Sequence, residues 1–189
     1  MRLIAGKHRG RRLTPPPGLD TRPTADRARQ ALFNILSHGR WVDVDGARVV
    51  DVFAGSGALG LEALSRGAAH VTFVDQHAAA IAAIRQNVEL LREQDACTIL
   101  RHDATRLPVA PQPCDLALLD APYQMTLSVP CLLSLQSQGW LAPHALTVIE
   151  VAAKEEFIAP SGFQIEDERI YGAARFVFLI RSGVVTPIL

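Results

Sequence analysis

Apolar residues recur along this chain in short continuous runs, and between the runs they repeat every three or four positions. Continuous apolar runs rich in β-branched residues are typical of strands that are buried on both faces of a sheet. Repeats of three or four residues predict helices with one apolar face. The runs predict strands over residues 47–54, 70–75, 97–104, 114–120 and 146–152, with helices over 58–67, 78–92 and 127–138.

The alternation of strands and helices predicts an α/β fold with a parallel sheet and helices on both faces. The C-terminal part differs, because "FQIEDERI" and "ARFVFLIR" flank "YGA" with no helix between them. This pattern indicates an antiparallel hairpin that turns at Gly172. The whole pattern therefore predicts a mostly parallel, seven-stranded sheet that ends in an antiparallel C-terminal hairpin.

The first 23 residues are predicted to form a separate arm, followed by a main domain over 24–189. "RLIAGKHRGRRLT" predicts a short basic hairpin in which Gly6 and Gly10 take positive φ. The proline-rich "TPPPGLDTRPT" predicts a stiff, extended linker. Thr24 is predicted to N-cap the next helix. The packed face of that helix should hold Ala28, Ala31, Leu32, Ile35 and Leu36.

Charge is distributed unevenly, although the net charge is zero. Residues 1–30 hold eight Lys and Arg against two Asp, so this segment carries +6 and the remainder −6. A basic end on an acidic body favours a polyanionic partner that binds one end of the protein. An ordinary solvated terminus explains the charge equally well.

Several classes of protein are disfavoured by the composition. No apolar run reaches the ~18 residues of a membrane span, and the N-terminus lacks the apolar region of a secretory signal. The three cysteines and six histidines lack the spacing of metal ligands, so we expect no metal site. We expect a cytoplasmic protein with reduced, buried cysteines and no membrane partner.

A glycine loop follows the first strand of the main domain. "VVDVFAGSGALG" contains G-x-G-x-x-G at Gly55, Gly57 and Gly60, between a predicted strand and a predicted helix. This context is the one in which such a loop binds an adenosine-containing ligand, such as a dinucleotide or S-adenosylmethionine. Ligands of open α/β sheets bind at the carboxyl ends of the strands, where this loop should lie.

Acidic residues near three strand ends favour S-adenosylmethionine over a dinucleotide. Asp51 would repel a pyrophosphate, but it would attract the ammonium and sulfonium groups of S-adenosylmethionine. Asp75 can accept the ribose hydroxyls of either ligand, and Asp103 with Ala104 suits the adenine amino group. A nicotinamide dinucleotide stays the alternative ligand. Asp51 could also serve only to cap a neighbouring loop.

The fourth predicted strand, "CDLALLD", ends in a cluster of unusual chemistry: Asp120, Ala121, Pro122 and Tyr123. The Asp120 carboxylate and the Ala121 carbonyl can hold the protons of an amino group and direct its lone pair toward a methyl donor. Tyr123 offers a flat ring on which a base can stack, typically worth ~1–3 kcal/mol. A carboxylate also opposes positive charge that grows on the nitrogen. The alternative is a strand-ending turn in which Asp120 caps a helix and Tyr123 packs.

These motifs together make the sequence recognisable. "DVFAGSGALGLEALSRGA" with "DAPY" resembles the class I, Rossmann-like S-adenosylmethionine-dependent methyltransferases with a [D/N/S]-P-P-[Y/F/W] motif. "RLIAGKHRGRRL", "TRPTADRARQALFNIL" and "YGAARFVFL" are similar, more closely, to the RsmD family. That resemblance covers essentially the whole chain. It implies methylation of the N2 amine of a guanine in 16S ribosomal RNA.

The RsmD resemblance also implies roles for individual residues. Catalytic roles fall on Asp120, Ala121, Pro122 and Tyr123. Cofactor contacts fall on Asp51, Ala54, Gly55, Ser56, Gly57, Asp75, Asp103 and Ala104, and on Arg22 and Thr24 in the segment expected to fold over the cofactor. RNA contacts fall on Arg2, Lys7, Arg9, Arg11 and Arg12. The expected substrate is 16S rRNA within an assembled or assembling 30S particle, acted on by a monomer.

Two positions depart from the family pattern. Ala121 stands where the family usually has the first proline of D-P-P-Y, so the loop loses one φ constraint, an effect of ~0.4–1 kcal/mol. The main-chain carbonyl survives this change, so we expect activity to be retained. Gln30 stands where the family often has Glu, which would weaken a contact in the segment over the cofactor.

Three other functions stay open on sequence alone. The same amine motif would serve an adenine-N6 or cytosine-N4 methyltransferase, or a glutamine-amide methylase. A nicotinamide oxidoreductase would use the same glycine loop, but no residues for hydride transfer are evident. A catalytically silent RNA-binding relative would explain Ala121 as a decayed site.

Overall fold

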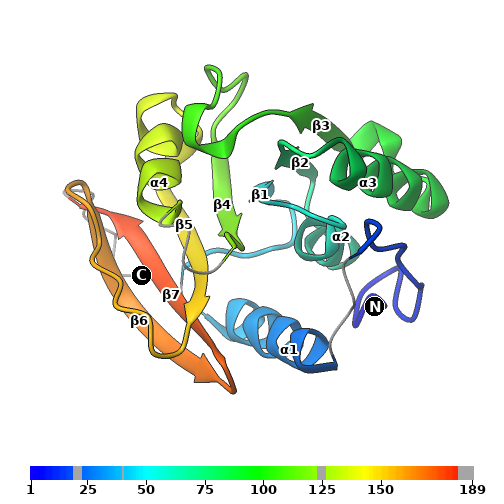
Figure 1. Cartoon of the computed structure of the whole chain (residues 1–189), viewed down its shortest axis with the longest axis horizontal. Coiled ribbons are helices and arrows are strands. Elements are labelled where there is room, and N and C mark those ends of the chain that lie inside the picture. Colours follow the sequence, from blue (N-terminus) through cyan, green and yellow to red (C-terminus); the bar gives the residue numbers. More distant parts are fainter. Residues whose placement is uncertain (19–22, 40, 123–126, 183–189) are drawn as a thin grey trace.

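Seven strands form one sheet in the order β3-β2-β1-β4-β5-β7-β6 (Figure 1). The structure is a computed structural model that describes residues 1–18, 23–39, 41–122 and 127–182, with only the backbone of residues 23–25. Strands β1 to β5 are parallel, and β7 pairs antiparallel with both β5 and β6. The strands are β1 Arg48–Val52, β2 His70–Asp75, β3 Cys97–Arg101, β4 Cys114–Leu119, β5 Leu141–Ala152, β6 Phe163–Tyr171 and β7 Ala174–Arg181. The predicted α/β sheet with its C-terminal hairpin is confirmed.

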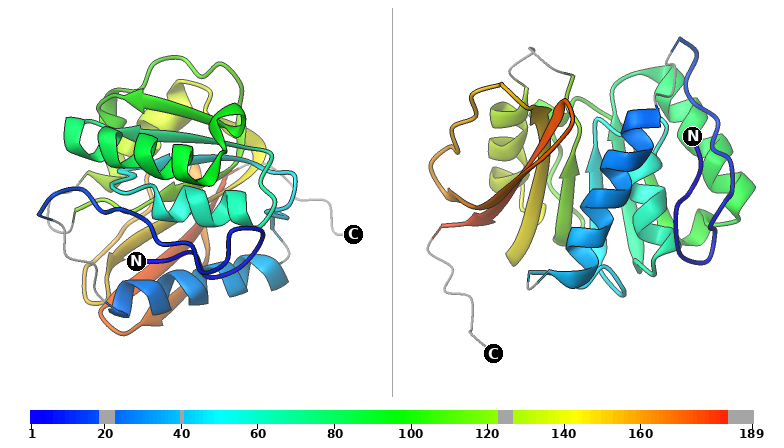
Figure 2. Two further views of the ribbon diagram at one scale, coloured as in Figure 1. Left: turned by 90° about the vertical axis from the view of Figure 1, so that its right-hand side faces the viewer. Right: turned by 90° about the horizontal axis from the view of Figure 1, so that it is seen from below.

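Helices cover both faces of this sheet, as Figure 2 shows. Apolar side chains of α1, α2 and α3 form one core with one face of the strands, while α4 and the short helix η2 pack on the other face. The helices are α1 Pro23–His38, α2 Ala58–Ser65, α3 Ala78–Leu91 and α4 Ser128–Ser137, with 3₁₀ turns η1 Gln94–Ala96 and η2 Ala104–Arg106. No helix in the described part of the chain combines the length and apolar character that crossing a membrane requires.

Among the elements whose bounds differ from those predicted, three differences have an identifiable cause. Helix α1 begins at Pro23, so Thr24 lies in its first turn, and the prediction of Thr24 as the N-cap is wrong. Proline suits a first helical position because its missing N–H would have no partner there. Strand β3 ends at Arg101 because Asp103 caps the turn η2. Strand β5 begins five residues early, at Leu141, across a register shift on β4.

The N-terminal segment forms the predicted hairpin. Arg2 and Arg12 form an antiparallel bridge, and Gly6 and Gly10 have φ of +76° and +83°. Leu3 and Leu13 are buried in the same core as α1, α2 and the sheet. The basic hairpin is thus packed onto the helical layer.

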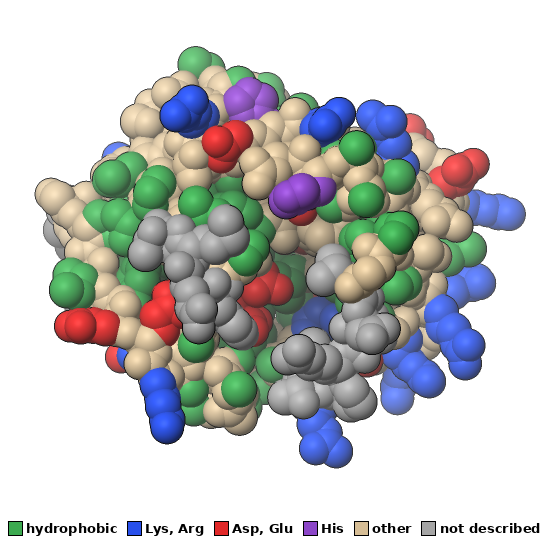
Figure 3. Space-filling view, viewed as in Figure 1, with side chains coloured by type: hydrophobic (Ala, Val, Ile, Leu, Met, Phe, Trp, Pro, Cys, Tyr) green, Lys and Arg blue, Asp and Glu red, His purple; other side chains and the backbone are tan. Residues whose placement is uncertain are grey.

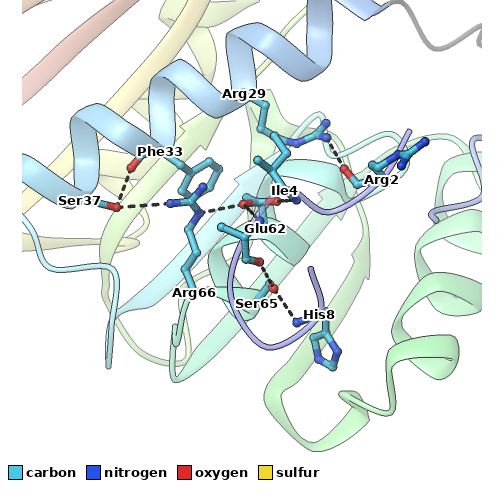
Figure 4. A network of polar contacts seen from close by, with 10 residues as sticks. Arg2, Ile4, His8, Arg29, Phe33, Ser37, Glu62, Ser65 and Arg66 are labelled. Atoms are coloured by element: carbon cyan, nitrogen blue, oxygen red, sulfur yellow. Dashed lines mark hydrogen bonds and ion pairs between the residues drawn. The ribbon is translucent and has the colours of Figure 1, made fainter. Parts of the chain in front are cut away.

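Buried polar groups of α2 hold this hairpin (Figure 4). The Glu62 carboxylate is fully buried and accepts hydrogen bonds from the N–H groups of Ile4 at 2.8 Å and Ala5 at 3.1 Å. Arg66 donates to the same carboxylate at 2.8 Å. The Ser65 hydroxyl accepts from the N–H of His8 at 3.0 Å. Because buried donors without partners cost ~1–3 kcal/mol each, these bonds fix the position of the hairpin.

Candidate functional site

Four acidic side chains lie on one face of the sheet, near the carboxyl ends of four neighbouring strands. Alternate residues of a strand point to opposite faces. The residue two places before each acid is buried in the core that α1 and α2 share with the sheet, so the acids point to that same side. In sheet order from β2 through β1 and β4 to β5, the acids are Asp75, Asp51, Asp120 and Glu150.

Asp51 fixes the start of α2. Its side chain is 1% exposed, and its Oδ2 atom accepts a hydrogen bond from the N–H of Gly60 at 2.9 Å. Burial raises the pKa of Asp51 well above its usual value, and the charges of Asp120 and Asp75 raise it further, while the Gly60 bond opposes them. The predicted capping role is therefore present. Because its pKa is raised, Asp51 would be stabilised in the ionised form by a bound cation.

Asp75 connects the end of β2 to the glycine loop. One carboxylate oxygen accepts from the N–H of Gly55 at 3.0 Å, and the other accepts from the N–H of His77 at 2.9 Å. The His77 ring atom Nδ1 also lies 3.0 Å from this second oxygen. An ionised carboxylate has about four acceptor positions, so these three contacts still leave capacity for a hydroxyl donor. The Gly55 bond holds the loop beside the end of β2.

The glycine loop uses backbone conformations that favour glycine. Gly55 and Gly57 have φ of +57° and +77°, and Phe53 is also in the left-handed region at +60°. A Cβ at Gly60 would lie 2.4 Å from a ring carbon of Phe73, so only glycine lets α2 pack this closely on β2. Among the described residues, a Cβ at Gly55 would come within 4 Å of the Phe53 carbonyl oxygen alone, at 3.9 Å. The first glycine therefore leaves its surroundings open to a ligand, while the last packs the helix against the sheet.

Asn87 of α3 ties the N-terminal segment to this loop. Its fully buried side-chain amide donates to the carbonyls of Ser56 and Thr14, each at 2.9 Å, and accepts from the N–H of Thr14 at 2.8 Å. The Ser56 hydroxyl contacts the Met1 sulfur at 3.3 Å. The basic hairpin and the glycine loop therefore share buried polar contacts.

Asp103 lies two residues beyond the end of β3. Its carboxylate accepts hydrogen bonds from the N–H and the hydroxyl of Thr105, at 2.9 Å and 2.8 Å. These bonds lower the pKa of Asp103, so it is ionised at neutral pH. Ala104 beside it is buried. The carboxylate of Asp103 and the backbone of Ala104 thus follow directly on the strand next to Asp75.

Asp120 follows the last residue of β4, on the strand adjacent to β1. The side chain reaches solvent, but the surrounding protein still desolvates it, and burial with the charge of Glu150 raises its pKa to about 7. Ala121 is buried and Pro122 is exposed. In Figure 3 acidic side chains gather around a hollow in the middle of this face. The motif thus places an acceptor of raised proton affinity at the carboxyl end of a central strand.

Three predicted site residues are not described as side chains. Arg22 and Tyr123 lie outside the described residues, and the side chain of Thr24 is also outside them. Among the side chains that are described, no group of three or more His, Cys, Asp or Glu could hold a metal ion. Burial raises the pKa of Cys97 and Cys114 to about 12, which keeps these thiols protonated and unreactive.

The basic residues of the hairpin differ in their surroundings. Arg2, Arg9, Arg11 and Arg12 are exposed, whereas the ammonium of Lys7 lies 2.8 Å from the carboxylate of Glu93. Figure 3 shows Lys and Arg side chains along the right-hand flank, where Figure 1 places the hairpin. The exposed guanidinium groups are open to a polyanion, while Lys7 already has a partner.

Comparison with known proteins adds to this geometry. Residues 1–180 match the family described as "Conserved hypothetical protein 95". The chain is 34% identical to ribosomal RNA small subunit methyltransferase D of Escherichia coli, over 93% of this chain and 87% of that protein. It is 30% identical to the protein of the same name from Haemophilus influenzae, over 93% of this chain and 91% of the relative. This chain belongs to the RsmD family.

A solved structure supports the RsmD assignment. The Escherichia coli protein yhhF, described as a candidate methyltransferase, superposes with a TM-score of 0.80 at 32% identity. The match covers 96% of this chain and 97% of yhhF. The resemblance read from the motifs is confirmed, and the mixed seven-stranded sheet is the class I, Rossmann-like methyltransferase fold.

Sequence reasoning missed three residues of this RsmD-family site: Glu62, Asn87 and Glu150. Glu62 and Asn87 lie in helical stretches, and only the tertiary structure shows that they hold the N-terminal hairpin. Glu150 carried a usable signal. "LTVIE" places an acid after an apolar run in the same way as "LALLD" places Asp120.

Proposed function

We propose that this RsmD-family protein transfers a methyl group from S-adenosylmethionine to the exocyclic N2 of a guanine in 16S rRNA. The observation that carries the proposal is the position of Asp120 and Ala121 at the end of β4, next to the strand that leads into the glycine loop. An amine acceptor and a nucleoside-binding loop thus share one edge of the sheet. The names of the relatives support ribosomal RNA as the substrate class.

The residues of the loop region fit S-adenosylmethionine. When bound, this cofactor supplies a methyl group on a positively charged sulfur. Asp51 and Asp120 lie among other acids, so a cationic nucleoside would relieve their repulsion. Asp75 would accept the ribose hydroxyls, and Asp103 with Ala104 would contact the adenine. Ala54, Gly55, Ser56 and Gly57 would line the cofactor, with Arg22 and Thr24 over it.

The amine would be held by two oxygen acceptors. The Asp120 carboxylate and the Ala121 carbonyl accept its protons, which turns the nitrogen lone pair toward the methyl group. As positive charge grows on the nitrogen, the carboxylate opposes it from a fixed position. Pro122 would restrict the backbone conformation of the loop, and Tyr123 would stack on the base. Ala121 keeps the carbonyl that the family motif needs, because any residue supplies it.

The RNA would bind across the exposed arginines of the hairpin. Arg2, Arg9, Arg11 and Arg12 would contact phosphates, with Lys7 contributing less because Glu93 already pairs with it. The target guanine must leave its stack, which costs a few kcal/mol, so a splayed site in a partly assembled 30S particle is the better substrate. We infer a cytoplasmic enzyme that acts as a monomer.

Two measurements test this function. Titration calorimetry should show binding of S-adenosylmethionine and S-adenosylhomocysteine but not NAD; binding of NAD alone would support an oxidoreductase. Labelled methyl transfer should proceed far faster into undermethylated 30S particles than into naked 16S rRNA. Asp120→Ala should abolish transfer while cofactor affinity changes little. Full turnover by Asp120→Ala, or an inactive wild-type protein that binds RNA, would overturn the proposal.

A further inference from the structure

Glu150 lies beside Asp120 on the neighbouring strand. Strands β4 and β5 are parallel and pair Leu119 with Ile149, so the residue that follows each of these is an acid, Asp120 after the end of β4 and Glu150 within β5. Leu118 and Val148, two places before these acids, are buried in the same core, so both carboxylates point to the same face of the sheet. Neighbouring strands are ~4.8 Å apart, which brings two like charges close together.

On its other side, Glu150 has an apolar neighbour on β7. Its partner on β7 is Phe176, which is 1% exposed. Arg175, the residue before Phe176 on β7, pairs with Glu168 of β6 at 3.3 Å. Glu150 itself is half-buried. Because Glu150 is half-buried, water screens its charge less than at a fully exposed site, and this charge helps to raise the pKa of Asp120.

The other charged groups around this edge come from three elements. Asp51 on β1 and Asp75 on β2 are acids, and the charges of Asp75 and Asp120 help to raise the pKa of Asp51. Helix α1, which covers this face, carries Asp26 and Arg29, which pair with each other at 2.9 Å, and the exposed Arg27. Among the described residues, Glu150 is the charged group with the main effect on Asp120.

We propose that Glu150 is a positioning residue for methyl transfer, whose carboxylate keeps Asp120 a strong acceptor for the proton that the amine releases. This inference rests on the proposed function and assigns a role to a residue outside the D-A-P-Y motif. Glu150 acts through Asp120 and need not touch the substrate.

Methyl transfer leaves the amine with one proton in excess, and a proton acceptor must take it. The amine nitrogen forms a bond to the methyl carbon as the carbon–sulfur bond breaks, and the electron pair of that bond stays on sulfur. The nitrogen is then a positively charged secondary ammonium with one proton in excess. That proton passes to the Asp120 carboxylate, which becomes a neutral acid and later releases it to solvent. An acceptor whose proton affinity matches the working pH is the most effective for such a transfer.

The direct test follows the titration of Asp120 in the protein without cofactor or RNA. With ¹³C-labelled aspartate carboxyls, the Asp120 signal is assigned by its loss in Asp120→Asn and followed from pH 4 to 9. In Glu150→Gln the midpoint should fall by ~1 pH unit, because a like charge has been removed. Glu150→Asp keeps the charge, so in this variant the Asp120 midpoint should lie near the wild-type value. Glu156→Gln, an exposed residue after β5, removes the same charge elsewhere and should shift nothing.

Kinetics give the second readout. The acid limb of the pH profile for methyl transfer should move with the Asp120 midpoint in Glu150→Gln, and the rate at pH 8 should fall about three- to tenfold. The KM for S-adenosylmethionine should not change. An Asp120 midpoint in Glu150→Gln equal to the wild-type value would overturn the inference and leave the proposed function intact. A wild-type protein without methyl transfer would overturn the proposed function, whatever the titration shows.

Discussion

The Asp51 carboxylate accepts a hydrogen bond from the N–H of Gly60 at 2.9 Å, so the acid before the glycine loop also fixes the helix after it. One residue thus has a structural role that a neutral acceptor could fill and a proposed binding role that needs its charge. The pKa of Asp51 is raised by its burial, so ionisation costs stability in the absence of a cation.

Substitutions at Asp51 should separate these two roles. Asp51→Asn keeps an oxygen acceptor for Gly60, so at pH 8 its free energy of unfolding should equal or exceed that of the wild type. Its affinity for S-adenosylmethionine should fall at least tenfold, about 1.4 kcal/mol, because the charge is lost. Asp51→Ala leaves the Gly60 donor buried and unpaired and should lose ~1–3 kcal/mol of stability. Urea unfolding and calorimetry measure both effects; unchanged cofactor affinity in Asp51→Asn would show that the charge is not used.

Asp120 should make the stability of the protein depend on pH in a defined window. Its pKa rises from an ordinary 3.8 to about 7 in the folded state. Between these values the unfolded chain releases the proton while the folded protein keeps it, so stability falls as pH rises, and the loss is complete above about 7. Asp120→Asn lacks this effect. Its stability relative to the wild type should increase from pH 4 to 7 and then level off, as measured by urea unfolding; a constant difference across this range would contradict the raised pKa.

Substitutions at Gly6 and Gly10 test how tightly the N-terminal hairpin packs against α2. Both have positive φ, but a Cβ at Gly6 would lie 1.6 Å from the Ser65 carbonyl oxygen, while a Cβ at Gly10 would meet no described residue within 4 Å. Gly10→Ala should cost only the left-handed conformation, ~1–2 kcal/mol. Gly6→Ala should in addition break the bond from Lys7 N–H to Ser65 and release the hairpin. Trypsin should therefore cleave the arginine-rich hairpin much faster in Gly6→Ala; equal cleavage of both variants would argue against a tightly seated hairpin.

The exposed arginines should control the salt dependence of RNA binding. Each phosphate contact contributes about 0.7 to 0.9 to the slope of log affinity against log salt. Arg9 and Arg11 changed together to Ala should weaken binding and make this slope shallower by about 1.5. Lys7→Ala should have a smaller effect, because the lysine pairs with Glu93 in the free protein. Filter binding between 50 and 200 mM salt measures the slopes; an unchanged slope in the double variant would show that the hairpin does not contact phosphate.

The fold could be predicted in large part because its strands are continuous apolar runs between helices with clear periodicity. Strand β2 lies over the residues predicted for it, and the turn at Gly172 lies between β6 and β7. The errors came where neighbours decide the bounds. Thr24 is a good N-cap residue, but the proline before it takes the first helical position. The early start of β5 depends on pairing with β4, which no local pattern records.

The candidate site was predictable where chemistry lies in one motif, and not where it depends on contacts across the fold. The positions of Asp51, Asp75 and Asp120 could be predicted, because each lies at or near the carboxyl end of a predicted parallel strand. The fixing of the hairpin by Glu62 and Asn87 joins positions more than 50 residues apart. Glu150 follows an apolar run as Asp120 does, but only the sheet order, which puts β5 next to β4, shows that the two acids are neighbours.

The central claim is that this protein methylates a guanine amine of small-subunit rRNA, and the modification itself tests it most directly. 16S rRNA is isolated from cells that lack the protein, from the same cells carrying the wild-type gene, and from cells carrying Asp120→Ala, and its nucleosides are mapped by mass spectrometry. The account predicts one N2-methylguanosine that is absent without the protein, restored by the wild type and not restored by the variant. An unchanged set of methylated guanines in all three would contradict it.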